Sequence, residues 1–80
     1  MPLAQQLQQA RDDVTQVLGR IEVQATLIER LRSAGHDTAA ADRLMATFLD
    51  LMTKLTIHRD ELERVAEELS RDGRNETPPR

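Results

Sequence analysis

The feature that most limits the fold is an interruption, Gly-His-Asp-Thr, between two long stretches of helical pattern. Gly35 is the residue type that most often ends a helix in the left-handed conformation, and the basic side chains just before it suit a carbonyl end. Asp37 or Thr38 can then cap a new helix by accepting a hydrogen bond from one of its first free N–H groups. The segment therefore predicts the end of one helix, a tight turn and the start of another.

Apolar residues recur on both sides of this turn at alternating spacings of three and four, which is typical of helix faces that pack in coiled coils. The first stretch begins at Pro2, whose fixed φ suits a first helical position. The pattern predicts an interhelical seam made of Leu3, Leu7, Ala10, Val14, Val17, Ile21, Ile28 and Leu31 from the first helix and Ala41, Leu44, Phe48, Leu51, Leu55, Leu62, Val65 and Leu69 from the second.

The predicted fold class is all-α, an antiparallel two-helix hairpin that resembles a coiled coil. Only 1% of the residues are aromatic, and the Ala-, Leu-, Gln-, Glu- and Arg-rich composition favours helix over strand. A short connection makes consecutive helices antiparallel neighbours. We expect a hairpin over residues 1–72, with helix one at about 2–34, a turn at 35–37 and helix two at about 38–71. Residues 73–80 have no apolar side chain and are expected to be disordered.

Two seam positions are polar, Gln24 in the first helix and His58 in the second. A buried amide must find a hydrogen-bond partner, so Gln24 is interpreted as a register-setting residue that lies level with Phe48. His58 could sense pH or bind a metal. A metal needs converging ligands, however, and the residue three positions before His58 is Leu55 rather than an acid. The favoured reading of His58 is structural, as a second register-setting position or a side chain that leans out to solvent.

A lone hairpin of this size covers only the seam between its helices and buries little surface. The chain has no cysteine, so disulfides cannot stabilise it, and self-association is the remaining device. We expect two hairpins to pack about a two-fold axis into a homodimeric four-helix bundle. Another protein could instead dock on the apolar surface that this dimer would cover. The predicted dimer or partner interface comprises Leu18, Ala25, Met45, Leu49 and Met52.

Several function classes are disfavoured. The net charge of −3 argues against nucleic acid as a partner. The sequence contains no Gly-rich phosphate loop, nucleophile elbow or metal-ligand cluster, so we expect no enzyme activity, catalytic residue, cofactor or small-molecule substrate. No apolar run is long enough to cross a membrane or to act as a signal peptide, and the expected compartment is the cytoplasm.

The second helix carries most of the acidic charge. From Arg59 to Asp72 there are three basic and six acidic side chains. Such a run is usually a solvated face with pairs four residues apart, here Arg59–Glu63 and Glu67–Arg71. It could also bind a basic partner. The alternative function is therefore a regulatory accessory protein that docks on a signalling or transcription partner through this acidic helix.

The stretch Ile28-Glu-Arg-Leu-Arg-Ser-Ala-Gly-His-Asp-Thr38, followed by Phe48 and Ile57-His-Arg-Asp60, resembles short uncharacterised proteins of alphaproteobacteria, especially rhizobia. Those proteins share a Gly-His-Asp-Thr turn between two helices, and the resemblance covers roughly residues 17–65. It implies a bacterial helical hairpin and no particular activity. The sequence thus predicts a small non-catalytic interaction or structural module that associates with itself.

Overall fold

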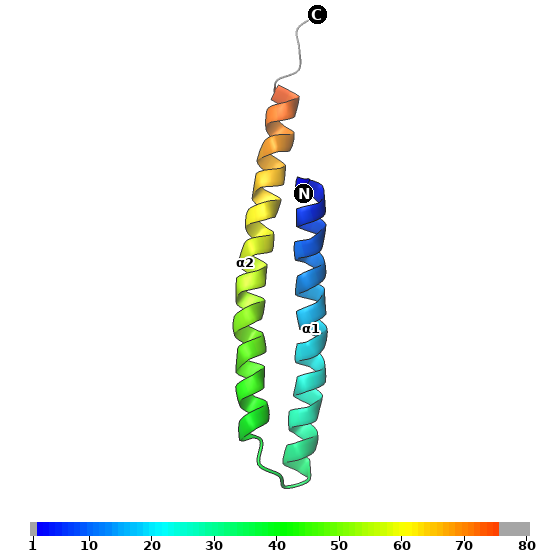
Figure 1. Ribbon diagram of the computed structural model, residues 1–80, viewed down its shortest axis with the longest axis vertical. Helices are drawn as coiled ribbons and strands as arrows, with labels where there is room; N and C mark the ends of the chain where they lie inside the picture. Colours follow the sequence, from blue (N-terminus) through cyan, green and yellow to red (C-terminus); the bar gives the residue numbers. More distant parts are fainter. Residues whose placement is uncertain (1, 76–80) are drawn as a thin grey trace, which may run out of the picture.

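Two long helices lie side by side and run in opposite directions (Figure 1). The computed structural model describes residues 2–75, of which α1 spans Leu3–Ser33 and α2 spans Ala39–Asn75. No strand occurs within this described part of the chain. The predicted antiparallel hairpin is confirmed.

The turn is built as the Gly-His-Asp-Thr segment predicts. Gly35 has a φ of 77°, in the left-handed region that glycine enters without a Cβ clash. Its N–H donates to the Arg32 carbonyl oxygen at 3.0 Å, and the N–H of His36 donates to that of Leu31 at 2.8 Å. This pair of bonds is the Schellman arrangement, which satisfies carbonyl groups that the helix leaves free at its end.

Asp37 and Thr38 both take part in the start of α2. The Asp37 carboxylate accepts a 3.0 Å hydrogen bond from the N–H of Ala39. Thr38 supplies its carbonyl oxygen to the N–H of Asp42 at 2.8 Å, and its hydroxyl donates to the Asp42 carboxylate at 2.9 Å. Of the two residues that the sequence offered as alternative caps, Asp37 therefore provides the side-chain cap, and the Thr38 hydroxyl instead holds the Asp42 carboxylate.

The outer ends of the helices differ from the prediction. Pro2 has a ψ of 151°, which is extended, so it precedes α1 instead of being its first helical residue. Helix α2 continues through Gly73 to Asn75, beyond the end predicted near residue 71. A glycine inside a helix costs only about 1 kcal/mol relative to alanine, and it ends a helix only where it turns left-handed. Residues 76–80 of the predicted disordered tail lie outside the described residues.

The buried centre of the seam comes from α1. Ala10, Val17 and Ile28 are its buried apolar residues among those described, and Gln24 is buried with them. Helix α2 contributes partly buried side chains that alternate at spacings of four and three: Ala41, Met45, Phe48, Met52, Leu55, Arg59, Leu62 and Ala66.

This set corrects half of the predicted α2 seam. Phe48, Leu55 and Leu62 lie in the seam as expected, but the other row has shifted by one residue, so that Met45 and Met52 replace Leu44 and Leu51. The exposed fractions of Leu44, Leu51, Val65 and Leu69 are 45%, 41%, 40% and 57%. The apolar stripe of α2 is wider than one seam, and rotating the helix by a single residue still buries an apolar row. Flexible methionines and the small Ala66 are the side chains turned inward.

Candidate interaction surface

The hairpin leaves two open flanks, one on each side of the seam. Residues four apart are about 40° apart around a helix. Around α2, Leu49 therefore lies on the outer side of the seam residues Met45 and Met52. Leu44 and Leu51 lie on the outer side of the seam residues Phe48 and Leu55, which is the opposite flank. Leu49 and Leu51 are therefore exposed on opposite flanks, with exposed fractions of 50% and 41%. We call Leu18, Ala25 and Leu49 the Leu49 flank. We call Leu44, Leu51, His58 and Val65, each seven residues from the next, the α2 row.

The predicted interface divides between the seam and the Leu49 flank. Met45 and Met52 are partly buried at the seam, and Met45 lines a surface hollow together with Ala25. Leu18 and Leu49 are about half exposed, and Ala25 is exposed as well. Because the two methionines are only partly exposed, this side of the hairpin presents less apolar surface than the sequence suggested.

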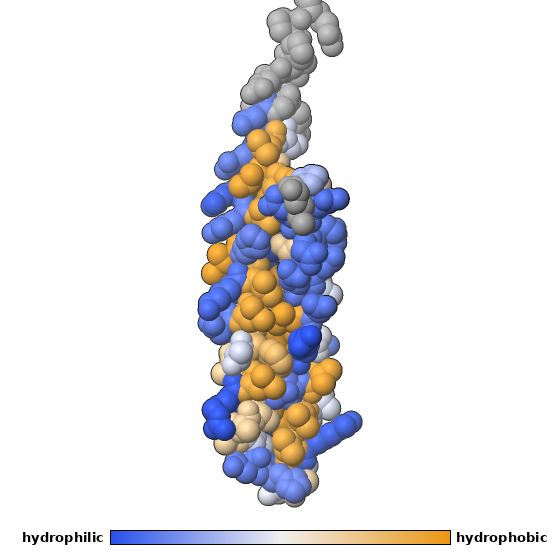
Figure 2. Space-filling model, in the orientation of Figure 1, coloured by the Kyte–Doolittle hydropathy of each residue, from blue (hydrophilic) through white to orange (hydrophobic). Residues whose placement is uncertain are grey.

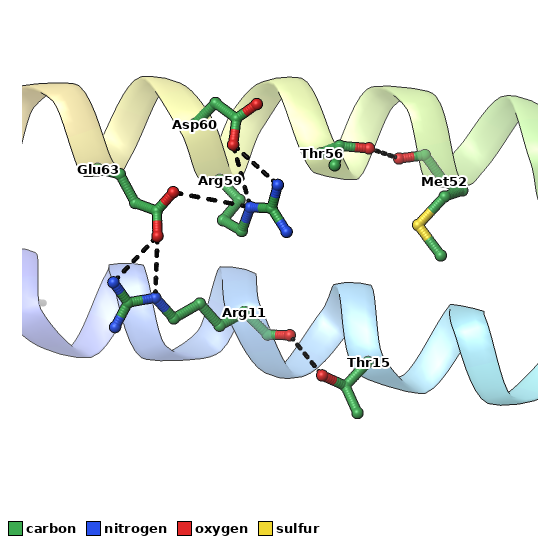
Figure 3. A network of polar contacts seen from close by, with 7 residues as sticks. All are labelled: Arg11, Thr15, Met52, Thr56, Arg59, Asp60 and Glu63. Carbon is green, nitrogen blue, oxygen red and sulfur yellow. Dashed lines mark hydrogen bonds and ion pairs between the residues drawn. The ribbon is translucent and has the colours of Figure 1, made fainter.

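Charged side chains occupy the surface on the same side of the hairpin as the Leu49 flank. The Nη2 and Nε atoms of Arg11 donate to one carboxylate oxygen of Glu63, at 3.0 and 3.2 Å, and thereby link α1 to α2 (Figure 3). Arg59 donates to Asp60 at 2.9 Å and lies 3.8 Å from Glu63. Exposed pairs of this kind contribute about 0.2–1 kcal/mol each. Their main effect here is to make this half of the flank polar.

Arg59 occupies the seam position that the sequence assigned to His58. Its side chain is 29% exposed, with its charged end directed to Asp60 and Glu63. An arginine can cover apolar surface with its methylene stem while its guanidinium stays hydrated. His58 is exposed, which agrees with the expected alternative of a side chain that leans out to solvent and not with a buried register-setting position. The pattern missed Arg59 because a charged residue is rarely assigned to a seam.

Gln24 lies in the seam as predicted. Its side chain is 6% exposed, and its amide nitrogen donates a 2.9 Å hydrogen bond to the carbonyl oxygen of Ala41 in the first turn of α2. Gln24 and Phe48 line the same shallow surface hollow, in agreement with the expected level of the two residues. Among the described side chains, no buried polar atom lacks a hydrogen-bond partner.

The α2 row is the more extensive apolar surface. Its three apolar members are 40–45% exposed, and α1 adds Leu27, which is 44% exposed, near the turn. Figure 2 shows hydrophobic surface along most of α2, whereas the N-terminal half of α1 is hydrophilic on the same face. Arg20 and Phe48 line the same hollow. The polar N-terminal half of α1 therefore lies on the same side of the seam as the α2 row.

Helix α2 also extends past the first residues of α1 (Figure 1). Leu69, near the C-terminal end of α2, is 57% exposed. Glu67, Glu68 and Asp72 are exposed around it, and Glu67 lies 3.7 Å from Arg71. The two ion pairs expected along this acidic stretch, Arg59–Glu63 and Glu67–Arg71, are both present.

Comparisons with known proteins return no match: no family model, curated protein or solved structure resembles the chain closely enough to be reported. In the described part of the chain, no three histidine or acidic side chains gather where a metal ion could be held. Neither α1 nor α2 contains an apolar stretch long enough to span a membrane.

Proposed function

We propose that this chain is a small non-catalytic interaction module that works as a homodimeric four-helix bundle in the bacterial cytoplasm. The observation that carries the proposal is the imbalance between buried and exposed apolar surface. Among the described residues, three apolar side chains are buried, while nine large hydrophobic ones are 40–71% exposed. Burial of apolar surface is the dominant favourable term in folding, so a hairpin with so small a core gains much of its stability by covering these residues.

A second copy of the chain is the simplest cover for this surface. It is present whenever the protein is made, and an isologous contact needs only one self-complementary patch. Contiguous apolar patches are seldom left bare on monomers. The bacterial origin and the compartment rest on the resemblance of the Gly-His-Asp-Thr turn region and on the charged, polar composition.

Sedimentation equilibrium over a wide range of protein concentrations tests the proposal. We expect a mass of twice the 9.1 kDa of the chain, and unfolding midpoints in urea that rise with protein concentration. A mass of one chain at every concentration, together with stable helical structure, would contradict it.

The exposed C-terminal end of α2 favours one second candidate, an accessory protein that docks on another protein through its acidic helix. Leu69 and the acidic residues around it would form an anchor surrounded by negative charge, which suits a partner with a basic groove. The same measurement separates the two functions. A monomer whose Leu69→Ala variant keeps its stability would favour the docking protein over the dimer.

A further inference from the structure

We infer that the α2 row is the surface that the second copy covers, and that the two α2 helices pack antiparallel about a two-fold axis close to His58. This inference rests on the proposed dimer and adds its face and its orientation. It places the contact on the flank opposite to Leu49.

Three members of the α2 row are evenly spaced about His58, and the position that mirrors Leu44 about it is Asp72. Leu51 precedes His58 by seven residues and Val65 follows it by seven. If the two α2 helices run in opposite directions and cross at His58, Leu51 of each copy meets the partner's Val65. Both contacts bury side chains that are 41% and 40% exposed in the hairpin. The axis then passes between the two imidazoles.

The C-terminal end of α2 has a place in the same arrangement. Leu69, four residues after Val65, is 57% exposed, and Leu44 at the turn end of the α2 row is 45% exposed. The antiparallel crossing brings each Leu44 level with the partner's Asp72, three residues or about 4.5 Å along the helix from the partner's Leu69. The C-terminal end of α2 therefore packs on the partner, at the turn end of the other hairpin.

Charge complementarity favours this orientation. Lys54 and Glu61 lie on the edge of α2 beside the α2 row, four residues before and three residues after His58. An antiparallel crossing places Lys54 opposite the partner's Glu61 and, by symmetry, forms this pair twice. Both side chains are exposed, and Lys54 contacts Asp50 at 3.0 Å within its own helix. No like charges face each other on this edge.

The alternative two-fold axis, parallel to the helices, is disfavoured by α1. It would lay the α2 row over the partner's α1, whose side chains on this flank include Asp13 and Arg20. Leu44 would then lie near the partner's Leu27. Leu51 and Val65, however, would lie close to the levels of the partner's Arg20 and the partner's Gln6 and would pack on polar side chains. Only α2 is apolar along its length on this flank.

Leu49 and Leu51 provide a matched pair for the test. They are the same residue type on the same helix, similarly exposed, and they face opposite flanks. By sedimentation equilibrium, we expect Leu51→Glu to weaken the dimer by at least about 100-fold, since a carboxylate replaces a buried leucine twice in the symmetric complex. Leu49→Glu should leave the dissociation constant within about threefold of the original.

Crosslinking tests the orientation in the otherwise unchanged protein. The chain has no cysteine, so a single introduced thiol is unique. With a short bismaleimide, His58→Cys should crosslink efficiently because the two thiols meet at the axis. Leu44→Cys should not, because the two sites would lie about 42 Å apart at 1.5 Å per residue.

Each outcome bears on a separate claim. A dimer that Leu49→Glu dissociates and Leu51→Glu leaves intact would overturn the inferred face and leave the proposed function standing. Crosslinking of Leu44→Cys as efficient as that of His58→Cys would overturn the antiparallel orientation. A wild-type protein that is monomeric at every concentration would overturn both the inference and the proposed function.

Discussion

Gln24 in α1 is joined to Ala41 in the first turn of α2 by a 2.9 Å hydrogen bond from the side-chain amide to the main-chain carbonyl oxygen. The donor is 6% exposed, so the bond is shielded from water. An apolar seam can slide by a turn at little cost, whereas this bond forms at one level only. We therefore expect Gln24 to specify the register between the two helices.

The first prediction compares two variants of Gln24. Gln24→Ala should lower the free energy of unfolding by about 1–3 kcal/mol, because it removes both the hydrogen bond and the packing of the buried stem. Gln24→Leu keeps the volume, and the Ala41 carbonyl keeps its helical partner, so stability should change by less than about 1 kcal/mol. Urea unfolding at one fixed protein concentration measures both.

The Leu variant also tests the register itself. If Gln24 sets it, the amide NMR spectrum of Gln24→Leu should show broadened or doubled signals near Ala41, as the helices sample more than one level. A single sharp set of signals at the wild-type positions would show that packing alone fixes the register.

The second prediction uses two glycines with opposite expected effects. Gly35→Ala should destabilise the hairpin by about 1–2 kcal/mol, because a φ of 77° disfavours any residue with a Cβ although no atom lies within 4 Å to clash with it. Gly19→Ala should stabilise it by about 0.5–1 kcal/mol, since Gly19 lies inside α1 and its added Cβ would also meet nothing. Thermal or urea unfolding would show the two signs. Stabilisation by both changes would contradict the role given to the turn.

The third prediction concerns the Asp37 cap. Asp37→Ala removes the acceptor of the Ala39 N–H and should cost about 0.5–2 kcal/mol. Asp37→Asn retains an oxygen acceptor and should lose only a fraction of that. His36→Ala serves as the control, because the bond of His36 to Leu31 is made by its main chain. Equal losses for all three variants, measured by urea unfolding, would mean that the carboxylate does not act as a cap.

The turn could be predicted from sequence because it depends on local chemistry. Gly35, Asp37 and Thr38 each act on main-chain groups within a few residues, and these preferences hold in most surroundings. Gly73 shows the limit of the same reasoning: a glycine allows a helix to end but does not require it, and α2 continues to Asn75.

The face of α2 could not be predicted in the same way. Leu44 beside Met45 and Leu51 beside Met52 give two apolar rows one residue apart, and periodicity scores them almost equally. What selects between them is the fit against α1, which depends on long-range contacts such as the ion pair between Arg11 and Glu63. The rotation of α2 by one residue relative to the prediction turns Met45 and Met52 inward and exposes His58. It also places the larger apolar surface on the flank opposite to Leu49.

The last prediction is a charge exchange across the inferred dimer contact. Lys54→Glu should weaken the dimer about 5- to 50-fold, because it places a glutamate opposite the partner's Glu61 at two symmetric sites. Glu61→Lys should weaken it by a similar factor through two facing lysines. The double variant Lys54→Glu with Glu61→Lys restores both opposite-charge pairs and should recover the wild-type dissociation constant to within about threefold.

Loss of the Asp50 contact to Lys54 does not explain such recovery, since Asp50 stays beside a glutamate in the double variant. The exchange should be measured at low salt, where pairs between exposed charges are least screened, and the effect should shrink as salt is added. Additive weakening in the double variant would place Lys54 and Glu61 on surfaces that do not meet.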